Sequence, residues 1–483
     1  MTRSSATGVE VGATRSYFVT PLIIATALFM EQLDGTVLAT ALPAMAADLH
    51  EDPVALKLAL TSYLLSLAVF IPLSGWAADR FGARRVFRAA IVVFTFGSIL
   101  CGLSNSLGAM VVFRIVQGLG GAMMTPVGRL VLLRTAPRQE LVRAMAYLTI
   151  PALIGPLIGP PVGGFIATYF HWRYIFWINV PIGALGVALV TRFIPDLREE
   201  WTPPLDVAGA ILSGVGLSCL VFGFTIAGRG FAPTPLVALI IALGAAALVA
   251  YVRHAKRAPY PIVDLDLLRI PTFRAAVFGG FLFRIGLGAT PFLLPLLLQA
   301  GFGLSAYEAG LLTFVSAAGA MAMKTTAQPI LRMFSFRRVL IVNALISAAF
   351  LAFNATFSAA TPHLIIMGAL LVGGFFRSLE FTALNALAYA DVDHDAMSRA
   401  TSFASVAQQL SLSTGVAIGA AALEAARALR GGGALQATDF TPAFILVATI
   451  SALAALQFLR LSPRAGEELV ARTPSATGRQ SSY

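Results

Sequence analysis

The stretch Phe29-Met30-Glu31-Gln32-Leu33-Asp34-Gly35-Thr36 lies inside an apolar run from about Tyr17 to Pro43, which is long enough to cross a bilayer as a helix. Its two carboxylates, Glu31 and Asp34, are three residues apart, so they share one face of that helix. A charged side chain at the bilayer centre costs about 2.5–3.5 kcal/mol on insertion scales. We therefore expect a titratable first helix that serves the function of the protein.

The composition predicts an all-α polytopic membrane protein. Of 483 residues, 58% are hydrophobic and 12% are charged, and the mean hydropathy is +0.82. A soluble protein carries about 25% charged residues. The apolar residues come in blocks of about twenty, the length of a membrane-spanning helix, whereas a transmembrane barrel needs short alternating segments.

The apolar blocks predict fourteen spans in the order six, two and six. Their centres fall near residues 28, 65, 95, 122, 155 and 183, then in 206–227 and 234–252, then near 285, 317, 347, 375, 412 and 450. The corresponding expected domains are an N-terminal six-helix bundle (1–200), two inserted helices (201–258) and a C-terminal six-helix bundle with a short tail (259–483). We expect the inserted pair at the periphery.

Charge predicts the orientation. Arginine and lysine gather in the loops that follow even-numbered spans and are sparse in the opposite loops. Because basic loops stay on the cytoplasmic side, both termini are expected there, and the net charge of +11 needs no nucleic-acid partner.

The two six-helix units share short matches at a constant spacing. Arg84-Arg85-Val86 recurs as Arg337-Arg338-Val339, and Gly120-Gly121 recurs as Gly373-Gly374, each 253 residues later. Both pairs fall in corresponding places, the loop after a second helix and the middle of a fourth. Parallel halves of this kind are found in the major facilitator fold.

The loop after the second span reads Gly75-Trp76-Ala77-Ala78-Asp79-Arg80-Phe81-Gly82-Ala83-Arg84-Arg85. It resembles the cytoplasmic signature of the major facilitator superfamily, which implies a gating latch between the halves. The gating residues would be Gly75, Asp79, Arg80, Gly82, Arg84 and Arg85. In the family the acid faces the start of a helix in the other half, here near Ser398 to Ser402. Alternatively the arginines only set topology, which leaves Asp79 and the glycine spacing unexplained.

The fourth span contains Arg114-Ile115-Val116-Gln117-Gly118-Leu119-Gly120-Gly121. It resembles the superfamily motif whose arginine is linked to proton transfer. A buried arginine keeps its charge, so it needs an acid, and Asp34 or Glu31 is the natural candidate. We expect Asp34 and Arg114 to form the proton-coupling pair, although a purely structural ion pair would look the same.

The fifth span is dense in glycine and proline, with Gly155, Pro156, Gly159, Pro160, Gly163 and Gly164. Glycine at every fourth position lets a neighbouring helix approach closely, and proline bends the helix. The pattern resembles the antiporter signature of proton-driven exporters. General membrane packing explains the stripe but not this density of glycine and proline.

Two further stretches narrow the resemblance. Leu33 to Val37 and His171 to Pro181 resemble the first-helix motif and the helix 5–6 junction of the fourteen-span drug:proton antiporters, the EmrB/QacA-type group. This resemblance implies the bacterial inner membrane, a proton gradient as driving force, and no cofactor or metal. It also implies a lipid environment, small-molecule substrates and protons as partners, with other envelope efflux components as an open possibility.

The C-terminal spans carry their own charges. The expected substrate cavity combines Glu31 with Arg284, Arg377, Glu380, Asn385, Gln408 and Gln409. Under the repeat, Arg284 corresponds to Glu31, so the two could face each other. Arg377 and Glu380 are one turn apart and could instead pair with each other.

The preferred interpretation is a proton-coupled secondary transporter that exports small amphipathic compounds by alternating access. One alternative is an exporter of a specific anionic or zwitterionic metabolite, and a less favoured one is a proton symporter. An enzyme is not expected, because no nucleophilic triad, metal cluster or phosphate loop stands out. A sensor or receptor would need a large soluble domain.

Overall fold

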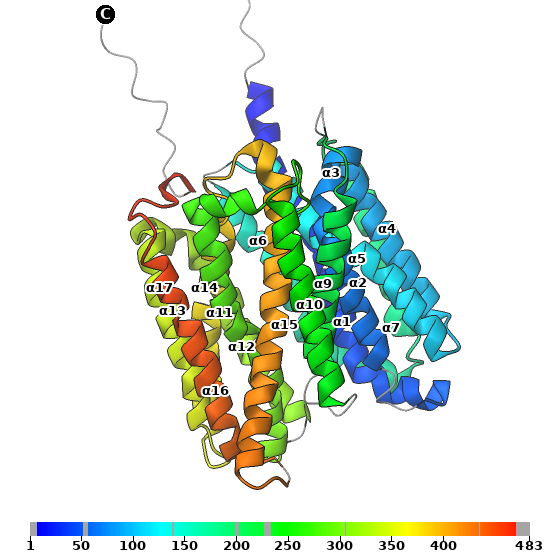
Figure 1. Ribbon diagram of the computed structural model, residues 1–483, viewed down its shortest axis with the longest axis vertical. Helices are drawn as coiled ribbons and strands as arrows, with labels where there is room; N and C mark the ends of the chain where they lie inside the picture. The colour runs from blue at the N-terminus through cyan, green and yellow to red at the C-terminus, as the bar shows by residue number, and fades with distance from the viewer. Residues whose placement is uncertain are drawn as a thin grey trace, which may run out of the picture.

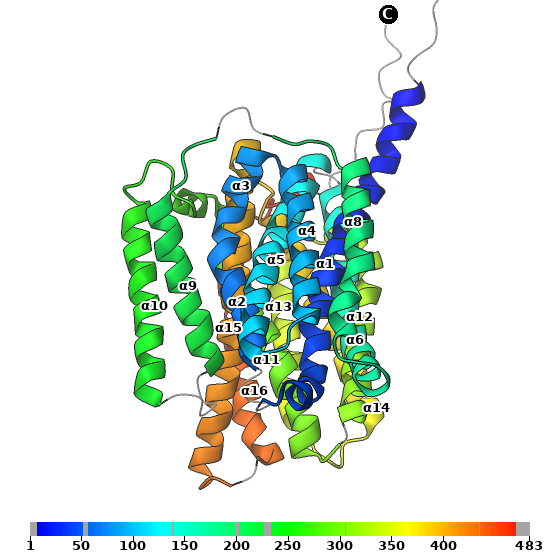
Figure 2. The ribbon, with the colours of Figure 1, turned by 90° about the vertical axis from the view of Figure 1, so that its right-hand side faces the viewer.

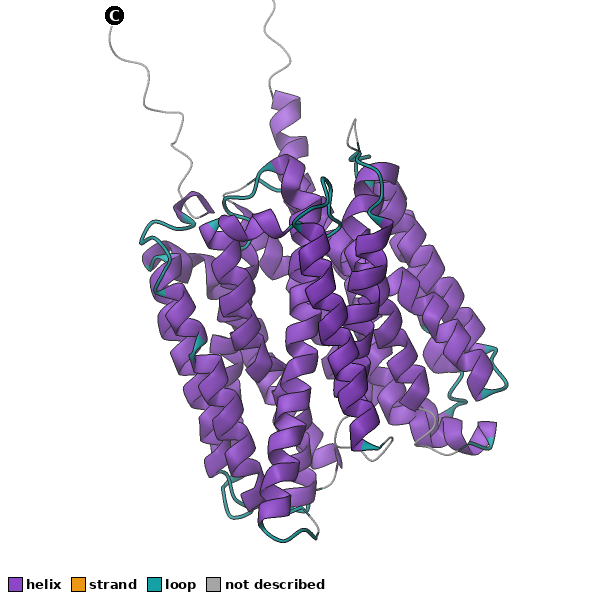
Figure 3. Cartoon of the chain, in the orientation of Figure 1, coloured by secondary structure: helices purple, strands orange, loops and turns teal. Residues whose placement is uncertain are grey.

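Long apolar helices form almost all of the chain that the computed structural model describes, and no strand occurs in that part (Figure 3). The described residues are 7–51, 57–137, 140–198, 202–226, 233–304, 306–433 and 435–469. Helices suit these sequences because the bilayer offers no hydrogen bonds, so the backbone must bond within each segment. The predicted all-α membrane class is confirmed.

The first half contains α1 (Thr7–Leu49), α2 (Lys57–Phe70), η1 (Ile71–Leu73), α3 (Ser74–Phe81), α4 (Ala83–Gly102), α5 (Leu107–Thr135), α6 (Leu141–Tyr169), α7 (Tyr174–Trp177) and α8 (Asn179–Phe193). Two helices follow, α9 (Val207–Ile226) and α10 (Thr234–Ala255).

The second half contains η3 (Leu265–Arg269), α11 (Pro271–Leu296), η4 (Leu297–Gly301), α12 (Ala306–Met333), α13 (Phe336–Phe353), η5 (Asn354–Thr356), α14 (His363–Leu387), η6 (His394–Ala396), α15 (Met397–Leu429), α16 (Ala437–Ala452), α17 (Ala454–Phe458) and η7 (Glu467–Leu469). Among the described residues, eleven helices are long and apolar enough to cross a membrane. The other three of the fourteen expected spans fall on α6, α9 and α12, so that number remains a prediction.

Local sequence explains several helix ends. Ser106 caps α5 by accepting a hydrogen bond from the amide of Ala109. Gln436 and Asp439 form a capping box at the start of α16. Gly82 has φ +91°, which glycine adopts without strain, and this turn separates α3 from α4.

The helices pack as two groups. The N-terminal group (α1–α8) and the C-terminal group (α11–α17) each have dense internal packing, for example α1 on α6 and α12 on α14 (Figure 1). Close helix crossings depend on glycine: a Cβ on Gly120 would lie 2.5 Å from the backbone nitrogen of Phe94. The domain limits 1–200, 201–258 and 259–483 remain a prediction.

The inserted helices lie along the seam between the two groups. Figure 2 shows α9 and α10 on the outside, beside α2 and α15, and α9 contacts both of those helices. Its Leu217 and Val221 are buried there. The pair thus lies at the periphery, as expected from sequence, and α9 in addition contacts one helix of each group.

The two groups meet most closely at the end that carries α3. There η1 and α3 pack against α15, and α5 packs against the same helix. The first turns of α1 and the last described residues, near Leu469, lie at this end as well (Figure 1). It is called the α3 end below.

Candidate functional site

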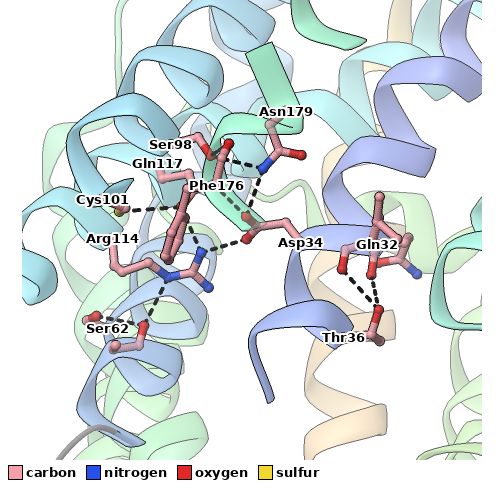
Figure 4. Close-up of polar contacts among 12 residues, drawn as sticks. Gln32, Asp34, Thr36, Ser62, Ser98, Cys101, Arg114, Gln117, Phe176 and Asn179 are labelled. Carbon is pink, nitrogen blue, oxygen red and sulfur yellow. Dashed lines mark hydrogen bonds and ion pairs between the residues drawn. The ribbon is translucent and has the colours of Figure 1, made fainter. Parts of the chain in front are cut away.

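Asp34 lies at the centre of a buried polar network in the N-terminal group (Figure 4). Its Oδ2 accepts a hydrogen bond from Arg114 Nη1 at 2.6 Å. Its Oδ1 accepts from Gln117 Nε2 at 2.9 Å and from Asn179 Nδ2 at 3.0 Å. The side chains of Asp34 and Arg114 are both 0% exposed. The carboxylate therefore has three donors from two other helices, α5 and α8.

Arg114 is fixed by further contacts. Its Nε donates to the carbonyl of Ala59 on α2 at 3.1 Å, and Nη1 also donates to Gln117 Oε1 at 2.7 Å. The guanidinium carbon lies 4.5 Å from the centre of the Tyr63 ring. Its Nη2 is buried without a hydrogen-bond partner. Arg114 thus has one ion-pair partner, and that partner is Asp34.

The three groups that contact the Asp34 carboxylate all donate hydrogen bonds to it. A proton on Asp34 must therefore displace at least one of them. Asn179 offers one alternative, since its Oδ1 is buried without a partner and could accept after the amide rotates. Proton binding is therefore tied to rearrangement of side chains from several helices.

Glu31 lies apart from this network. It is half-buried, and its Oε2 accepts a hydrogen bond from Thr125 of α5 at 3.0 Å. The expected contact with Arg284 is wrong: Arg284 donates instead to Asn385 Oδ1 at 3.4 Å. The short sequence repeat predicted a pairing across the halves, whereas each side chain finds its partner within its own helix group.

The glycine stripe of α6 packs against the helix that carries Asp34. A Cβ on Gly155 would lie 3.0 Å from the backbone nitrogen of Leu33, and one on Gly159 would overlap Thr36. Gly163 is buried. The surroundings of Pro156, Pro160 and Gly164 lie outside the described residues. Because Gly155 and Gly159 have no side chains, α1 can approach α6 closely at these positions.

The expected latch joins α3 to α15. The Gly75 amide donates to Ser402 Oγ at 2.8 Å, and a Cβ on Gly75 would lie 2.6 Å from the carbonyl oxygen of Ser398. Asp79 accepts from the Ser398 hydroxyl through Oδ2, and from Arg134 of α5 through Oδ1 at 3.0 Å. Asp79 thus contacts the start of α15 through the hydroxyl group of Ser398.

The basic residues of the same motif do not reach the other helix group. Arg84 and Arg85 approach Asp196 at 3.9 and 3.5 Å, just beyond α8, and Arg80 is exposed. A Cβ on Gly82 would lie 3.0 Å from Asp196 Oδ1. Their expected role in joining the halves is therefore corrected: Arg84 and Arg85 hold α4 to the end of α8, and Arg80 points away from both.

A second link between the groups involves Arg129 of α5, which is 6% exposed. Its Nη1 donates to the hydroxyl of Tyr389 at 3.2 Å, and its Nη2 to Gln408 Oε1 at 3.4 Å. Arg129 is not among the site residues predicted from the sequence, and the available signal was a second arginine in the same span, fifteen residues beyond Arg114.

The charged residues of the C-terminal group are not gathered in one cavity. Arg377 donates to Ser316 Oγ at 2.8 Å, and Glu380 accepts from Asn343 Nδ2 at 3.1 Å. The alternative in which Arg377 and Glu380 pair with each other is therefore absent. Gln409 faces α9 beside Leu217, away from the other candidates. The expected common cavity is wrong for these residues, because Arg377 bonds to α12, Glu380 to α13, and Gln409 lies against α9.

Sequence reasoning missed three members of the Asp34 network. Gln117 follows Arg114 by three residues on the same helix face, and Asn179 lies inside the second motif that was matched. Ser98 of α4 accepts from Asn179 Nδ2 at 2.9 Å and donates to the carbonyl of Phe176 at 2.8 Å. In the described part of the chain, no cluster of three His, Cys, Asp or Glu residues suits a metal ion.

The model of the Major Facilitator Superfamily matches residues 24–250 and 276–481. The chain belongs to this superfamily. Its predicted fold is confirmed, and the protein is a multi-pass membrane transporter of small molecules, not an enzyme.

Curated relatives support the narrower group. The chain is 38% identical over 398 residues to the multidrug resistance protein MdtD of Escherichia coli O6:H1, covering 82% of this chain and 84% of that protein. It is 38% identical over 445 residues to MdtD of Pectobacterium atrosepticum, covering 91% and 95%. The resemblance to the drug:proton antiporter group is confirmed.

Solved structures share the fold at low identity. The proton:xylose symporter XylE bound to 6-bromo-6-deoxy-D-glucose gives a TM-score of 0.66 at 15% identity, covering 94% of this chain and 98% of that one. The human organic anion transporter MFSD10 gives a TM-score of 0.64 at 15% identity, covering 92% and 99%.

Proposed function

We propose that the protein exports small amphipathic compounds, as a multidrug efflux transporter, in exchange for protons. The observation that carries the proposal is the fully buried Asp34–Arg114 pair. Two relatives named as multidrug resistance proteins support the export of drugs, and the motif of α6 favours antiport over symport.

The proton site would be Asp34, with Arg114 as its counter-ion. In the state described here the carboxylate is satisfied by three donors. A proton would loosen Arg114 and so free α1 from α5. Because α6 packs closely on α1 and also contacts α12 and α14, a shift of α1 would pass to the C-terminal group. One charge moving through 100 mV supplies about 2.3 kcal/mol for uphill export.

We infer that the α3 end is cytoplasmic and that the protein lies in a bacterial inner membrane with both termini inside. Basic residues support this orientation, since the Arg80–Arg88 segment lies at that end. The contacts of Gly75, Asp79 and Arg129 would then close the cytoplasmic side, which corresponds to the outward-facing half of the cycle. Other envelope efflux components remain open as partners.

The alternative substrate class is an anionic or zwitterionic metabolite. It is favoured by three cations within the C-terminal spans, the buried Arg284 and Lys324 and the half-buried Arg377, none of which forms an ion pair in the described part of the chain. Unpaired buried charges are costly and mark functional positions in membrane proteins.

The test is transport in proteoliposomes with an imposed pH gradient, using a fluorescent cationic dye and an anionic one. Asp34→Asn is expected to abolish gradient-driven uptake into inside-out vesicles while leaving dye exchange without a gradient. Asp266→Asn, which changes an exposed acid of the linker after α10, is the matched control. Normal gradient-driven transport by Asp34→Asn would contradict proton coupling through this residue.

A further inference from the structure

A pocket lies inside the C-terminal helix group, between α11, α13, α14 and α16. Part of this pocket is open to the outside. Its apolar walls include Phe283, Leu287, Phe350 and Leu370, and its polar residues include Arg377, Ser347 and Asn354. It lies apart from the Asp34 network, which belongs to the N-terminal group.

Three polar residues on this pocket have hydrogen-bonding capacity that the described chain does not use. Arg377 uses one of its five donor hydrogens on Ser316 and forms no ion pair among the described residues. Ser347 Oγ is buried without a hydrogen-bond partner. Asn354 is 5% exposed, and its side-chain amide makes no hydrogen bond within the described chain. Three helices or turns thus direct unused donors at one apolar space.

The nearby acid does not neutralise Arg377. Glu380 lies one turn further along α14, but its Oε2 accepts from Asn343 and its Oε1 has no partner. An interhelical bond to Ser316 alone needs only a serine or threonine, not a guanidinium. Arg377 is half-buried within an apolar span, where a guanidinium costs more than a hydroxyl group, so its presence calls for an anionic group that is absent from the bare protein.

We propose that this Arg377 pocket binds the acidic group of an amphipathic molecule, with the apolar body of that molecule against Phe283 and Phe350. A guanidinium matches the two oxygens of a carboxylate, phosphate or sulfonate, and Ser347 and Asn354 supply further donors. The proposal rests on the proposed function, since it names a substrate class for the transporter. The same chemistry is offered by a free fatty-acid-like anion and by a lysophospholipid headgroup.

Binding can be measured on the full-length protein in nanodiscs of phosphatidylcholine, without any gradient. The probe is 11-(dansylamino)undecanoate, whose fluorescence rises in an apolar site, and its methyl ester is the uncharged match. The wild type is expected to bind the acid about tenfold more tightly than the ester, the effect of one charge-assisted hydrogen bond. Competition with oleate and with lysophosphatidylglycerol then shows whether the pocket prefers a free anion or a lipid headgroup. Displacement of the probe by either supports the proposal.

Three variants test the site. Arg377→Ala is expected to remove the preference for the acid, Arg377→Lys to keep part of it, and Ser347→Leu to fill the pocket and weaken both probes. Arg338→Ala, an exposed arginine on α13, is the control and should bind as the wild type does. If Arg377→Ala does not fold, the lysine and leucine variants carry the test.

Equal affinity for the acid and the ester in the wild type would overturn the proposal. So would unchanged acid preference in Arg377→Ala with a wild-type melting curve. Asp34→Asn is expected to bind the probe normally, so a failure of proton coupling leaves this measurement intact. Conversely, absence of probe binding would leave gradient-driven export of other compounds standing.

Discussion

Arg129 Nη1 lies 3.2 Å from the hydroxyl oxygen of Tyr389, so a helix of the N-terminal group is bonded to the end of α14 in the C-terminal group. Arg129 and Arg114 are on the same helix, fifteen residues and about 22 Å apart along its axis. The helix that holds the Asp34 counter-ion therefore also joins the two helix groups near the α3 end.

This relationship predicts that Tyr389→Phe opens the α3 end. The variant removes one hydrogen bond to a charged group, worth about 1.5–3 kcal/mol, so the open state should gain population about tenfold or more. Electron spin resonance distances between labels at Arg88 and Arg338, both exposed near that end, would measure the shift. Tyr174→Phe, at an exposed tyrosine of α7, should leave the distances unchanged.

Gly75→Ala should separate α3 from α15. The added Cβ would lie 2.6 Å from the Ser398 carbonyl oxygen and 2.7 Å from Ser402 Oγ, and overpacking of this kind costs about 1–3 kcal/mol. We expect loss of gradient-driven transport together with easier labelling of a cysteine placed at Ser402. The matched change is Gly35→Ala, where a Cβ meets nothing within 4 Å. Equal transport by the two variants would refute the latch.

The sequence predicted the features that depend on local pattern. The apolar blocks predicted the helices, and the motif around Gly75 predicted a contact with Ser398 and Ser402. The pairing of Arg114 was narrowed to two acids, since a buried guanidinium needs one. These predictions succeeded because each depends on one large free-energy term, such as the cost of burying an unpaired charge or an unbonded backbone group.

Side-chain partners that depend on helix rotation could not be predicted. Glu31 and Arg284 correspond under the repeat. However, Glu31 accepts a hydrogen bond from Thr125, and Arg284 donates one to Asn385. A rotation of one helix by one residue, about 100°, changes which neighbour a side chain meets. For the same reason the sequence could not show that Arg377, Glu380 and Gln409 contact different neighbouring helices.

Asn179→Ala should weaken proton-coupled transport. The variant removes the hydrogen bond from Asn179 Nδ2 to Asp34 Oδ1, so the carboxylate is held less firmly between α5 and α8. One hydrogen bond to a charged group is worth about 1.5–3 kcal/mol, so the rate of gradient-driven transport is expected to fall. Initial rates of exchange in proteoliposomes with an imposed pH gradient would measure the loss. Gln32→Ala, an exposed neighbour on α1, serves as the control.

Asp48 provides a pH-dependent clamp at the end opposite α3. The hydrogen bond from Trp172 Nε1, at 2.9 Å, is the main reason that the pKa of Asp48 lies below its ordinary value, and Arg173 at 2.8 Å contributes. A lowered pKa means that this stabilisation is complete above the ordinary pKa of aspartate, about 3.9, and is lost as the pH falls through the lowered value. Melting temperatures measured from pH 3 to 6 should therefore fall less steeply on the acid side in Asp48→Asn than in the wild type, while Asp266→Asn follows the wild type. Parallel curves for Asp48→Asn and the wild type would show that the clamp contributes nothing to stability.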